Sequence, residues 1–175
     1  MPTRRPLARR PGYTSLLNAE NVSKADPRLR AIGAIDEASA SLSLAKAFLP
    51  GEPEKSALGT CQAHLSLMMA GLAGWNQADF QENLTQALDW LEALLSELEN
   101  KVELPGKFLR PGRTPAEGAL DLARAVVRRA ERETVELAQS GIGAELPSDV
   151  LTYLNRLSSL CFLLLAAQAA GQESN

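Results

Sequence analysis

Apolar residues recur at intervals of three and four along most of the chain, which is the period of a helix face and not that of a strand. The pattern is clearest in two segments, where it is carried by Leu58, Cys61, Leu65, Met68 and Leu72 and by Leu84, Leu88, Leu91, Leu95 and Leu98. With the helix-breaking residues between them, these repeats predict helices over residues 27–48, 53–74, 79–100, 115–139 and 148–170. Since no segment alternates apolar and polar residues as a half-buried strand does, we expect an all-α fold, a five-helix bundle.

Residues typical of helix starts precede three of these segments. They are Asp26 followed by Pro27, Asp79 with Glu82 three positions later, and Thr114 followed by Pro115 and Glu117. Residues 101–113 contain two Pro-Gly steps and predict the longest loop inside the fold. The last helix is apolar nearly all the way round from Leu157 onward, which predicts a position in the middle of the bundle or at a subunit interface.

Length and charge limit the classes of protein to which the chain can belong. With 175 residues, 45% of them hydrophobic, we expect one domain over residues 1–175. The net charge of −3 disfavours a nucleic-acid-binding protein. Residues 1–11 contain four arginines and no acidic residue, and we expect residues 1–22 to form a basic arm or loop.

The longest apolar run predicts no transmembrane helix. This run, CFLLLAA from Cys161, is much shorter than the roughly 20 residues that cross a bilayer, and the arginine-rich start lacks the apolar core of a secretory signal. We therefore expect a soluble cytoplasmic protein without a membrane partner. Cys61, Cys161 and the only histidine, His64, lack the spacing of metal ligands, so we expect core positions in a reducing compartment and no metal site.

Arg124, Arg128 and Arg132 are spaced four residues apart and therefore share one face of the fourth predicted helix. Like charges at this spacing destabilise an isolated helix by about 0.2–0.5 kcal/mol per pair, so acidic residues or an anion must lie near them. One interpretation is a solvated face with ion pairs inside the helix. The pairs would be Asp121 with Arg124, Arg128 with Glu131, Arg129 with Glu133, and Arg132 with Glu136.

The other interpretation is an interface or an anion site on the same face. The helical period predicts a buried stripe opposite the arginines, formed by Ala119, Leu122, Ala123, Val126, Ala130 and Leu137. Leu120, Val127 and Val135 then lie beside or within the arginine arc, which would leave aliphatic side chains on a solvated face. Arginine is also suited to forked binding of phosphate or carboxylate. In the last helix, Asn155 and Arg156 interrupt an apolar run and need polar partners.

Four sequence blocks follow one another along the chain. They are GYTSLLNAENVSKADPR (12–28), GAIDEASASLSLA (33–45), FLRPGRTPAEGALDLARAVVRRAER (108–132) and YLNRLSSLCF (153–162). With these blocks, the chain resembles the PduO-type ATP:cob(I)alamin adenosyltransferases, the corrinoid adenosyltransferase family, over nearly its whole length. The most specific feature is RRAER followed by LNRLS, after a Phe-x-x-Pro-Gly loop.

The resemblance implies a five-helix bundle that forms a homotrimer with active sites between subunits. It implies transfer of the 5′-deoxyadenosyl group of ATP to the cobalt of cob(I)alamin, giving adenosylcobalamin and triphosphate. ATP with Mg²⁺ and cobalamin would bind, and a reductase or an adenosylcobalamin-dependent enzyme would be a partner. Because cobalt is the nucleophile, the protein would contribute charge neutralisation and positioning rather than a nucleophilic side chain.

Residue by residue, the resemblance implies an ATP site and a subunit contact. The ATP-binding residues would be Thr14, Ser15, Lys24, Arg128, Arg129, Glu131, Arg132 and Asn155. Arg128 would also be catalytic, together with Phe108, which matches an aromatic wedge below the corrin. Asp36 and Arg124 match a pair that joins neighbouring subunits.

The chain departs from the family pattern where ligands are expected. A segment like TRTGDxGxT is normal near the N-terminus, whereas this chain has PLARRPGYT from Pro6 to Thr14, and Ser159 replaces the aspartate of LNRLSD. Arg9 and Arg10 offer charge in place of backbone donors. Two hypotheses of different class stay open: an active adenosyltransferase, or a non-catalytic trimeric relative that binds a corrinoid, a nucleotide or another anion or serves as an assembly module. A helical bundle with an unrelated protein partner is a third.

Overall fold

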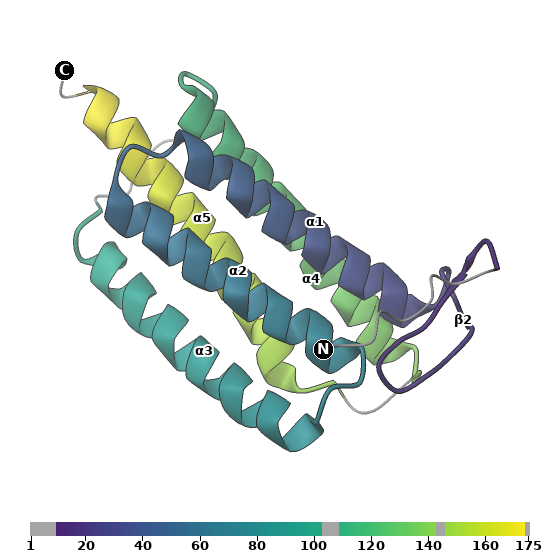
Figure 1. Ribbon diagram of the computed structural model, residues 1–175. Coiled ribbons are helices and arrows are strands. Elements are labelled where there is room, and N and C mark those ends of the chain that lie inside the picture. Colours follow the sequence, from purple (N-terminus) through teal and green to yellow (C-terminus); the bar gives the residue numbers. More distant parts are fainter. Residues whose placement is uncertain (1–9, 103–108, 143–145, 174–175) are drawn as a thin grey trace, which may run out of the picture.

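Five long helices form a bundle in which consecutive helices run in opposite directions (Figure 1). The computed structural model describes residues 10–102, 109–142 and 146–173. The helices are α1 (Pro27–Phe48), α2 (Glu52–Leu72), α3 (Gln77–Glu99), α4 (Pro115–Gln139) and α5 (Ser148–Glu173). Two short strands, β1 (Tyr13–Thr14) and β2 (Val22–Ser23), pair antiparallel at one end of the bundle. The predicted all-α bundle is confirmed, while this small hairpin was not predicted.

Helix α5 lies in the middle of the bundle, where it packs against α2, α3 and α4. Tyr153, Leu157 and Leu160 of α5 are completely buried. The segment Ser148–Gly171 has a mean hydropathy of 1.6, so α5 is long and apolar enough to cross a membrane. The longest apolar run in the sequence did not indicate this. Because 61% of that window is buried inside the bundle, a central position in the core explains its apolar character.

Two of the helix starts differ in how well the sequence predicted them. Asp26 caps α1 as expected, and its Oδ1 accepts a hydrogen bond from the Arg28 amide at 2.9 Å. The hydrogen bond from the Arg28 side chain lowers the pKa of Asp26. The prediction of Asp79 as the cap of α3 is wrong, because Asn76 takes this role and accepts from the Ala78 amide at 3.2 Å. Asparagine caps helices as well as aspartate does, and Asn76 comes first along the chain.

The start of α4 is fixed by Thr114 and Glu117. The Thr114 hydroxyl accepts from the Glu117 amide at 3.2 Å, as predicted for a cap. The Glu117 carboxylate is 1% exposed and accepts from the amide of Arg113 at 2.9 Å, one residue before the position that a capping box uses. Arg113 also donates to the carbonyl of Ala169 at 3.0 Å, which ties the loop before α4 to the end of α5.

The buried stripe of α4 differs from the predicted one. The buried residues are Ala116, Glu117, Ala119, Leu120, Ala123, Val127, Ala130, Thr134 and Leu137. Leu120 and Val127 are completely buried, whereas Leu122, a predicted core residue, is 49% exposed. The reason is that α4 packs against both α1 and α5, so its stripe faces the space between two helices. Leu120 and Val127 therefore belong to the core, and the argument that they indicate a second interface is wrong.

A polar cluster lies at the edge of the core between α2, α3 and α5, where His64, predicted in the core, is half-buried. The hydroxyl of the buried Tyr153 lies 2.9 Å from Nδ1 of His64, and the imidazole packs edge-on against Tyr153 and Trp90. Burial lowers the pKa of His64, because the charged imidazole would lose its hydration. Cys61 and Cys161 are buried, as predicted, and burial raises the pKa of the Cys61 thiol to about 12.

Acid should destabilise the fold through His64. Because its pKa in the folded chain lies below the ordinary value of 6.5, the unfolded chain binds more protons, and stabilisation present above about pH 6.5 is lost as the pH falls through the folded value. We expect the free energy of unfolding in urea to decrease between pH 7 and pH 5, and to decrease less in His64→Gln, which keeps a polar partner for Tyr153. Equal decreases in the two proteins would contradict this assignment.

Candidate functional site

A seam of charged side chains joins α1 to α4. One terminal nitrogen of Arg30 in α1 donates to Glu133 and to Glu136 in α4, both at 2.7 Å. Arg129 of α4 forms an ion pair with Glu37 of α1. The pKa of Arg30 is raised, first by the hydrogen bond to Glu136 and then by the one to Glu133. Because the two helices run in opposite directions side by side, residues far apart in the sequence meet in pairs along this seam (Figure 1).

Helix α5 engages a further acidic residue of α4. The Nδ2 of Asn155 donates to Oε1 of Glu131 at 3.0 Å. This contact brings together two of the residues that the sequence assigned to one ATP site. It also leaves the carbonyl oxygen of the Asn155 side chain available as an acceptor, since the amide nitrogen is turned toward Glu131.

These contacts replace most of the ion pairs predicted within α4. Asp121 and Arg124 form the predicted pair at 2.8 Å. The other predicted pairs, Arg128 with Glu131, Arg129 with Glu133 and Arg132 with Glu136, are wrong. The physical reason is that side chains of the packed neighbours α1 and α5 reach the same carboxylates and hold them across the helix boundaries.

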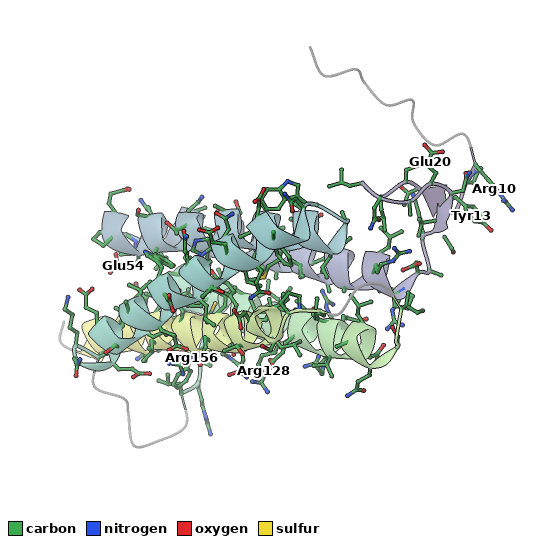
Figure 2. All side chains as sticks on the ribbon, turned by 90° about the horizontal axis from the view of Figure 1, so that it is seen from below. Arg10, Tyr13, Glu20, Glu54, Arg128 and Arg156 are labelled. Atoms are coloured by element: carbon green, nitrogen blue, oxygen red, sulfur yellow. The ribbon has the colours of Figure 1, made fainter. Side chains whose placement is uncertain are left out.

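Among the described residues, no partner is consequently left for Arg128 and Arg132. Both side chains are exposed, and neither forms an ion pair or hydrogen bond with any residue in the part of the chain that the structure describes. Figure 2 shows Arg128 directed away from the bundle. Two guanidiniums one helical turn apart, with their N–H groups free, are suited to bind the oxygen atoms of phosphates or carboxylates.

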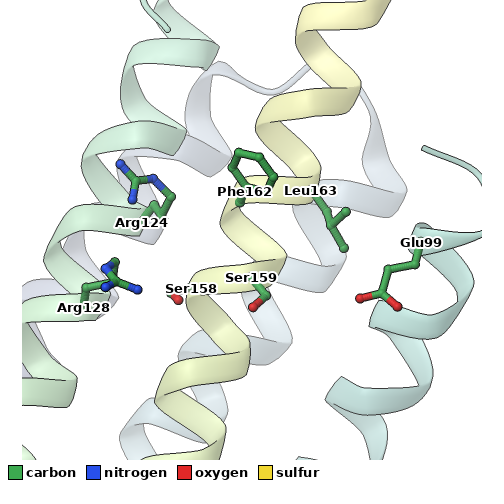
Figure 3. A pocket seen from close by; sticks show the side chains of 7 residues that line it. All are labelled: Glu99, Arg124, Arg128, Ser158, Ser159, Phe162 and Leu163. Atoms are coloured by element: carbon green, nitrogen blue, oxygen red, sulfur yellow. The ribbon is translucent and has the colours of Figure 1, made fainter. Parts of the chain in front are cut away.

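A groove of about 380 Å³ opens beside Arg128 (Figure 3). It is lined by Arg124 and Arg128 of α4, Ser158, Ser159, Phe162 and Leu163 of α5, and Glu99 of α3. The arginines lie on one side and Glu99 on the other, with the hydroxyls and the aromatic ring between them. Phe162 is 37% exposed, which is unusual for an aromatic residue of a central helix. The groove therefore offers both an apolar surface and cationic groups to one ligand.

The N-terminal hairpin stands at the end of the bundle where α4 finishes (Figure 1). It is attached there by the amide of Leu17, which donates to the carbonyl of Ala73 at 2.8 Å. Of the three ATP-site residues predicted on this segment, Thr14 is partly buried, and Ser15 and Lys24 are exposed. The predicted arm over residues 1–22 is thus in part an ordered hairpin.

Arg10 is held on the hairpin by an aromatic ring. Its guanidinium carbon lies 4.0 Å from the centroid of the Tyr13 ring, and Figure 2 shows both side chains beyond the ends of the helices. A cation in this position keeps its charge exposed to ligands. The positive charge of Arg10, which the sequence predicted for this segment, therefore lies on the surface beside Tyr13.

The described residues contain no group of three or more His, Cys, Asp or Glu side chains that could hold a metal ion.

The sequence model of the cobalamin adenosyltransferase family matches residues 10–168. The chain belongs to this family. The match includes the hairpin, the seam residues and the groove, so the resemblance given by the four sequence blocks is confirmed.

Curated relatives of this cobalamin adenosyltransferase family member agree with the assignment. The chain is 33% identical to the corrinoid adenosyltransferase PduO of Salmonella typhimurium over 160 residues, which are 90% of this chain and 47% of the relative. It is 31% identical to the corrinoid adenosyltransferase of Bacillus subtilis over 155 residues, 86% of this chain and 78% of the relative. The chain spans about half the length of the PduO proteins of Salmonella typhimurium and Citrobacter freundii.

Solved structures of the family have the same fold. A variant of the PduO-type adenosyltransferase from Lactobacillus reuteri, complexed with ATP, has a TM-score of 0.79 at 28% identity and covers 93% of this chain and 91% of its own. Another variant of that enzyme, complexed with cobalamin and ATP, has a TM-score of 0.76 at 28% identity, with coverages of 89% and 87%.

The remaining predicted site residues of this family member are dispersed. Asp36 is exposed on α1 and is not paired with Arg124 in the same chain, since Arg124 holds Asp121. Arg129 points to Glu37 and is thus drawn away from Arg128 and Arg132. Phe108 lies outside the described residues.

Sequence reasoning missed some residues of the site. Phe162 carried a signal, because it follows Asn155 and Ser159 at helical spacing and so shares their exposed face. Arg30 and Glu99 carried none, because their neighbours are set by the packing of α1 against α4 and of α3 against α5. Arg156 pairs with Glu92 of α3 at 2.6 Å, which supplies the polar partner it was expected to need.

The free guanidiniums predict that the arginines of the site can be removed without loss of stability. In urea denaturation, Arg128→Ala and Arg132→Ala should each change the free energy of unfolding by less than about 0.5 kcal/mol, as surface substitutions without partners do. A loss well above that value for either variant would show that its side chain has a structural partner.

Proposed function

We propose that this chain is an ATP:corrinoid adenosyltransferase, which transfers the 5′-deoxyadenosyl group of ATP to the cobalt of cob(I)alamin. The observation that carries the proposal is that Arg128 and Arg132 have no ion-pair or hydrogen-bond partner among the described residues, while Arg128 also lines a groove with an aromatic surface. Membership of the family and relatives that are complexed with cobalamin and ATP support it.

In the proposed reaction, the electron pair of Co(I) attacks C5′ of ATP. A Co–C bond forms, the C5′–O bond breaks, and triphosphate leaves with the electrons of that bond. Negative charge grows on the leaving oxygen, so cations already fixed near it lower the barrier more than flexible ones would. Arg128 and Arg132 are assigned this role, with Arg128 as the catalytic residue, and Asn155, held by Glu131, would accept a hydrogen bond from the nucleoside.

The corrin is assigned to the groove beside Arg128. Phe162 and Leu163 offer apolar surface against a macrocycle, and Ser158 and Ser159 offer hydroxyls to its amide side chains. The volume of about 380 Å³ suits part of a corrinoid, and the rest would be covered by other residues. Phe108 is proposed as an aromatic wedge below the corrin, on the strength of the family resemblance.

Mg²⁺ is proposed to arrive with ATP. Magnesium in phosphate-transfer sites keeps several waters and binds substrate phosphates with one or two carboxylates, so it requires no cluster of protein ligands. Glu131 is the acidic residue closest in sequence to both free arginines and is the candidate for such a carboxylate. The ion would balance the charge of the triphosphate that leaves.

The proposal includes a homotrimer in the cytoplasm. Asp36 is exposed on α1, and we assign it to Arg124 of a neighbouring subunit, in keeping with the family pair. Such a contact would bring the α4 face of one subunit to another subunit, whose hairpin residues Thr14, Ser15 and Lys24 could complete the ATP site. A reductase that supplies Co(I), or an enzyme that uses adenosylcobalamin, would be the partner.

The sequence before the hairpin favours a second candidate function. PLARRPGYT contains two prolines, which lack amide donors, in place of the glycine-containing family segment. A chain that lost its triphosphate loop would act as a non-catalytic trimer that binds a corrinoid, a nucleotide or another anion. The two functions are distinguished by whether the chain forms adenosylcobalamin from ATP and cob(I)alamin.

Anaerobic turnover tests the proposal. The purified chain, chemically reduced cob(I)alamin and Mg·ATP should give the absorbance change of Co–C bond formation, and triphosphate should appear in equal amount. Without turnover, separate titrations of ATP and cobalamin in the same preparation identify the half-site that is absent, and the non-catalytic function replaces the enzymatic one.

Arg128→Ala should weaken ATP binding. Loss of hydrogen bonds to a charged group costs roughly 1.5–3 kcal/mol, which corresponds to a rise in the dissociation constant of about one to two orders of magnitude. Calorimetric titration with Mg·ATP checks this, and Lys55→Ala serves as a control on α2, which has no contact with α4 among the described residues. An unchanged ATP affinity would remove Arg128 from the site.

Asp36→Asn should weaken the trimer more than the fold. The substitution removes one charge of the proposed subunit contact and leaves the unfolding transition of the chain little changed, since Asp36 is exposed. Sedimentation velocity over a concentration series should show dissociation at higher protein concentrations than for the unchanged chain. Identical profiles would contradict the assignment of Asp36 to the interface.

A further inference from the structure

We infer that Arg30 is a positioning residue for the anion site on α4: it holds Glu133 and Glu136 and thereby keeps the guanidinium of Arg132 free for phosphate. The inference rests on the proposed function, because it takes the polyphosphate of ATP as the ligand. It concerns a residue of α1 that lies outside the assigned ATP site.

The sequence of α4 by itself would pair the arginines with its own acids. Arg132 and Glu136 are four residues apart, as are Arg129 and Glu133, and opposite charges at this spacing attract each other on a helix surface. A carboxylate on Arg132 would compete directly with a phosphate oxygen for the same N–H groups. Arg132 can therefore stay unpaired only if another residue binds the carboxylate of Glu136.

Arg30 of α1 binds these carboxylates. Its terminal nitrogen lies 2.7 Å from Oε2 of both Glu133 and Glu136, which are charge-assisted hydrogen bonds of short length. Arg129 pairs with Glu37 across the same seam, so this arginine is directed to α1 as well. The seam does not change how many charges α4 carries. It separates them, since Glu133 and Glu136 are held by α1 while the side chains of Arg128 and Arg132 are exposed.

The place of Arg30 in the chain connects this effect to the hairpin. Arg30 lies in the first turn of α1, directly after β2 and the Asp26 cap. Asp26 is itself held by Arg28 at 2.9 Å, which fixes the start of the helix. The same short segment therefore anchors the hairpin with its proposed triphosphate-binding residues and clears the acids from the α4 face.

The test compares Arg30→Met with two charge-matched double variants. Met keeps an unbranched apolar side chain of similar length to the aliphatic part of arginine and removes the donors. Arg30→Met should raise the dissociation constants of Mg·ATP and of inorganic triphosphate with Mg²⁺ about two- to fivefold, the range expected when one or two ion pairs of this spacing compete. Since Arg30 does not touch the reacting atoms, KM for ATP should rise while kcat stays within about twofold.

Rescue distinguishes positioning from a general effect of charge. Arg30→Met with Glu136→Gln should restore the affinity, because no carboxylate is left for Arg132 to bind. Arg30→Met with Glu82→Gln has the same net charge, but Glu82 lies on α3, which has no contact with α4 among the described residues, so the affinity should stay reduced.

Three outcomes separate the inference from the proposed function. An unchanged affinity in Arg30→Met, or equal affinities in the two double variants, would overturn the role of Arg30 while ATP binding by the unchanged chain still stands. Restored affinity in Arg30→Met with Glu136→Gln, but not in Arg30→Met with Glu82→Gln, supports the role of Arg30. If the unchanged chain binds neither ATP nor triphosphate, the proposed function fails, and the inference fails with it.

Discussion

The charged seam between α1 and α4 is the interaction on which the site depends. Arg30 spans Glu133 and Glu136, and Glu37 pairs with Arg129, so that two helices from distant parts of the sequence are held in one register. Exposed ion pairs of this kind contribute little to the free energy of folding, and the apolar packing beneath them supplies the stability. Their effect is on placement, because Glu133 and Glu136 of α4 are held toward α1.

The bundle then brings the cationic face next to the groove to which we assign the corrin. Helix α5 is central and apolar, and it reaches the surface between α3 and α4, where Phe162 lies in the groove with Arg128. Asn155 on the same helix donates to Glu131 and so fixes this carboxylate beside the arginine face. A nucleotide bound to α4 and a corrinoid bound along α5 would thus meet. This is the arrangement that direct attack by cobalt on C5′ requires, with the protein supplying position and charge.

The helices, the family and the arginine face could be predicted from the sequence, because periodicity, caps and the order of motifs are local properties. The partners of the arginines could not. Spacing of three and four residues paired Arg129 with Glu133 and Arg132 with Glu136, whereas packing gave these acids to Arg30. The predicted buried stripe of α4 was wrong for the same reason. Leu120 and Val127 are buried and Leu122 is exposed because α4 packs against both α1 and α5. Asn76 replaced Asp79 as a cap because two suitable residues stood close together.

The central claim is that α4 presents its guanidiniums to the triphosphate because its acids are held elsewhere. A crystal structure of the chain with Mg·ATP and a cobalamin tests it most directly. The account predicts phosphate oxygens within hydrogen-bonding distance of Arg128 and Arg132, with Arg30 still on Glu133 and Glu136 and the corrin beside Phe162. Triphosphate bound away from α4, or Arg132 paired with Glu136 in the complex, would contradict it.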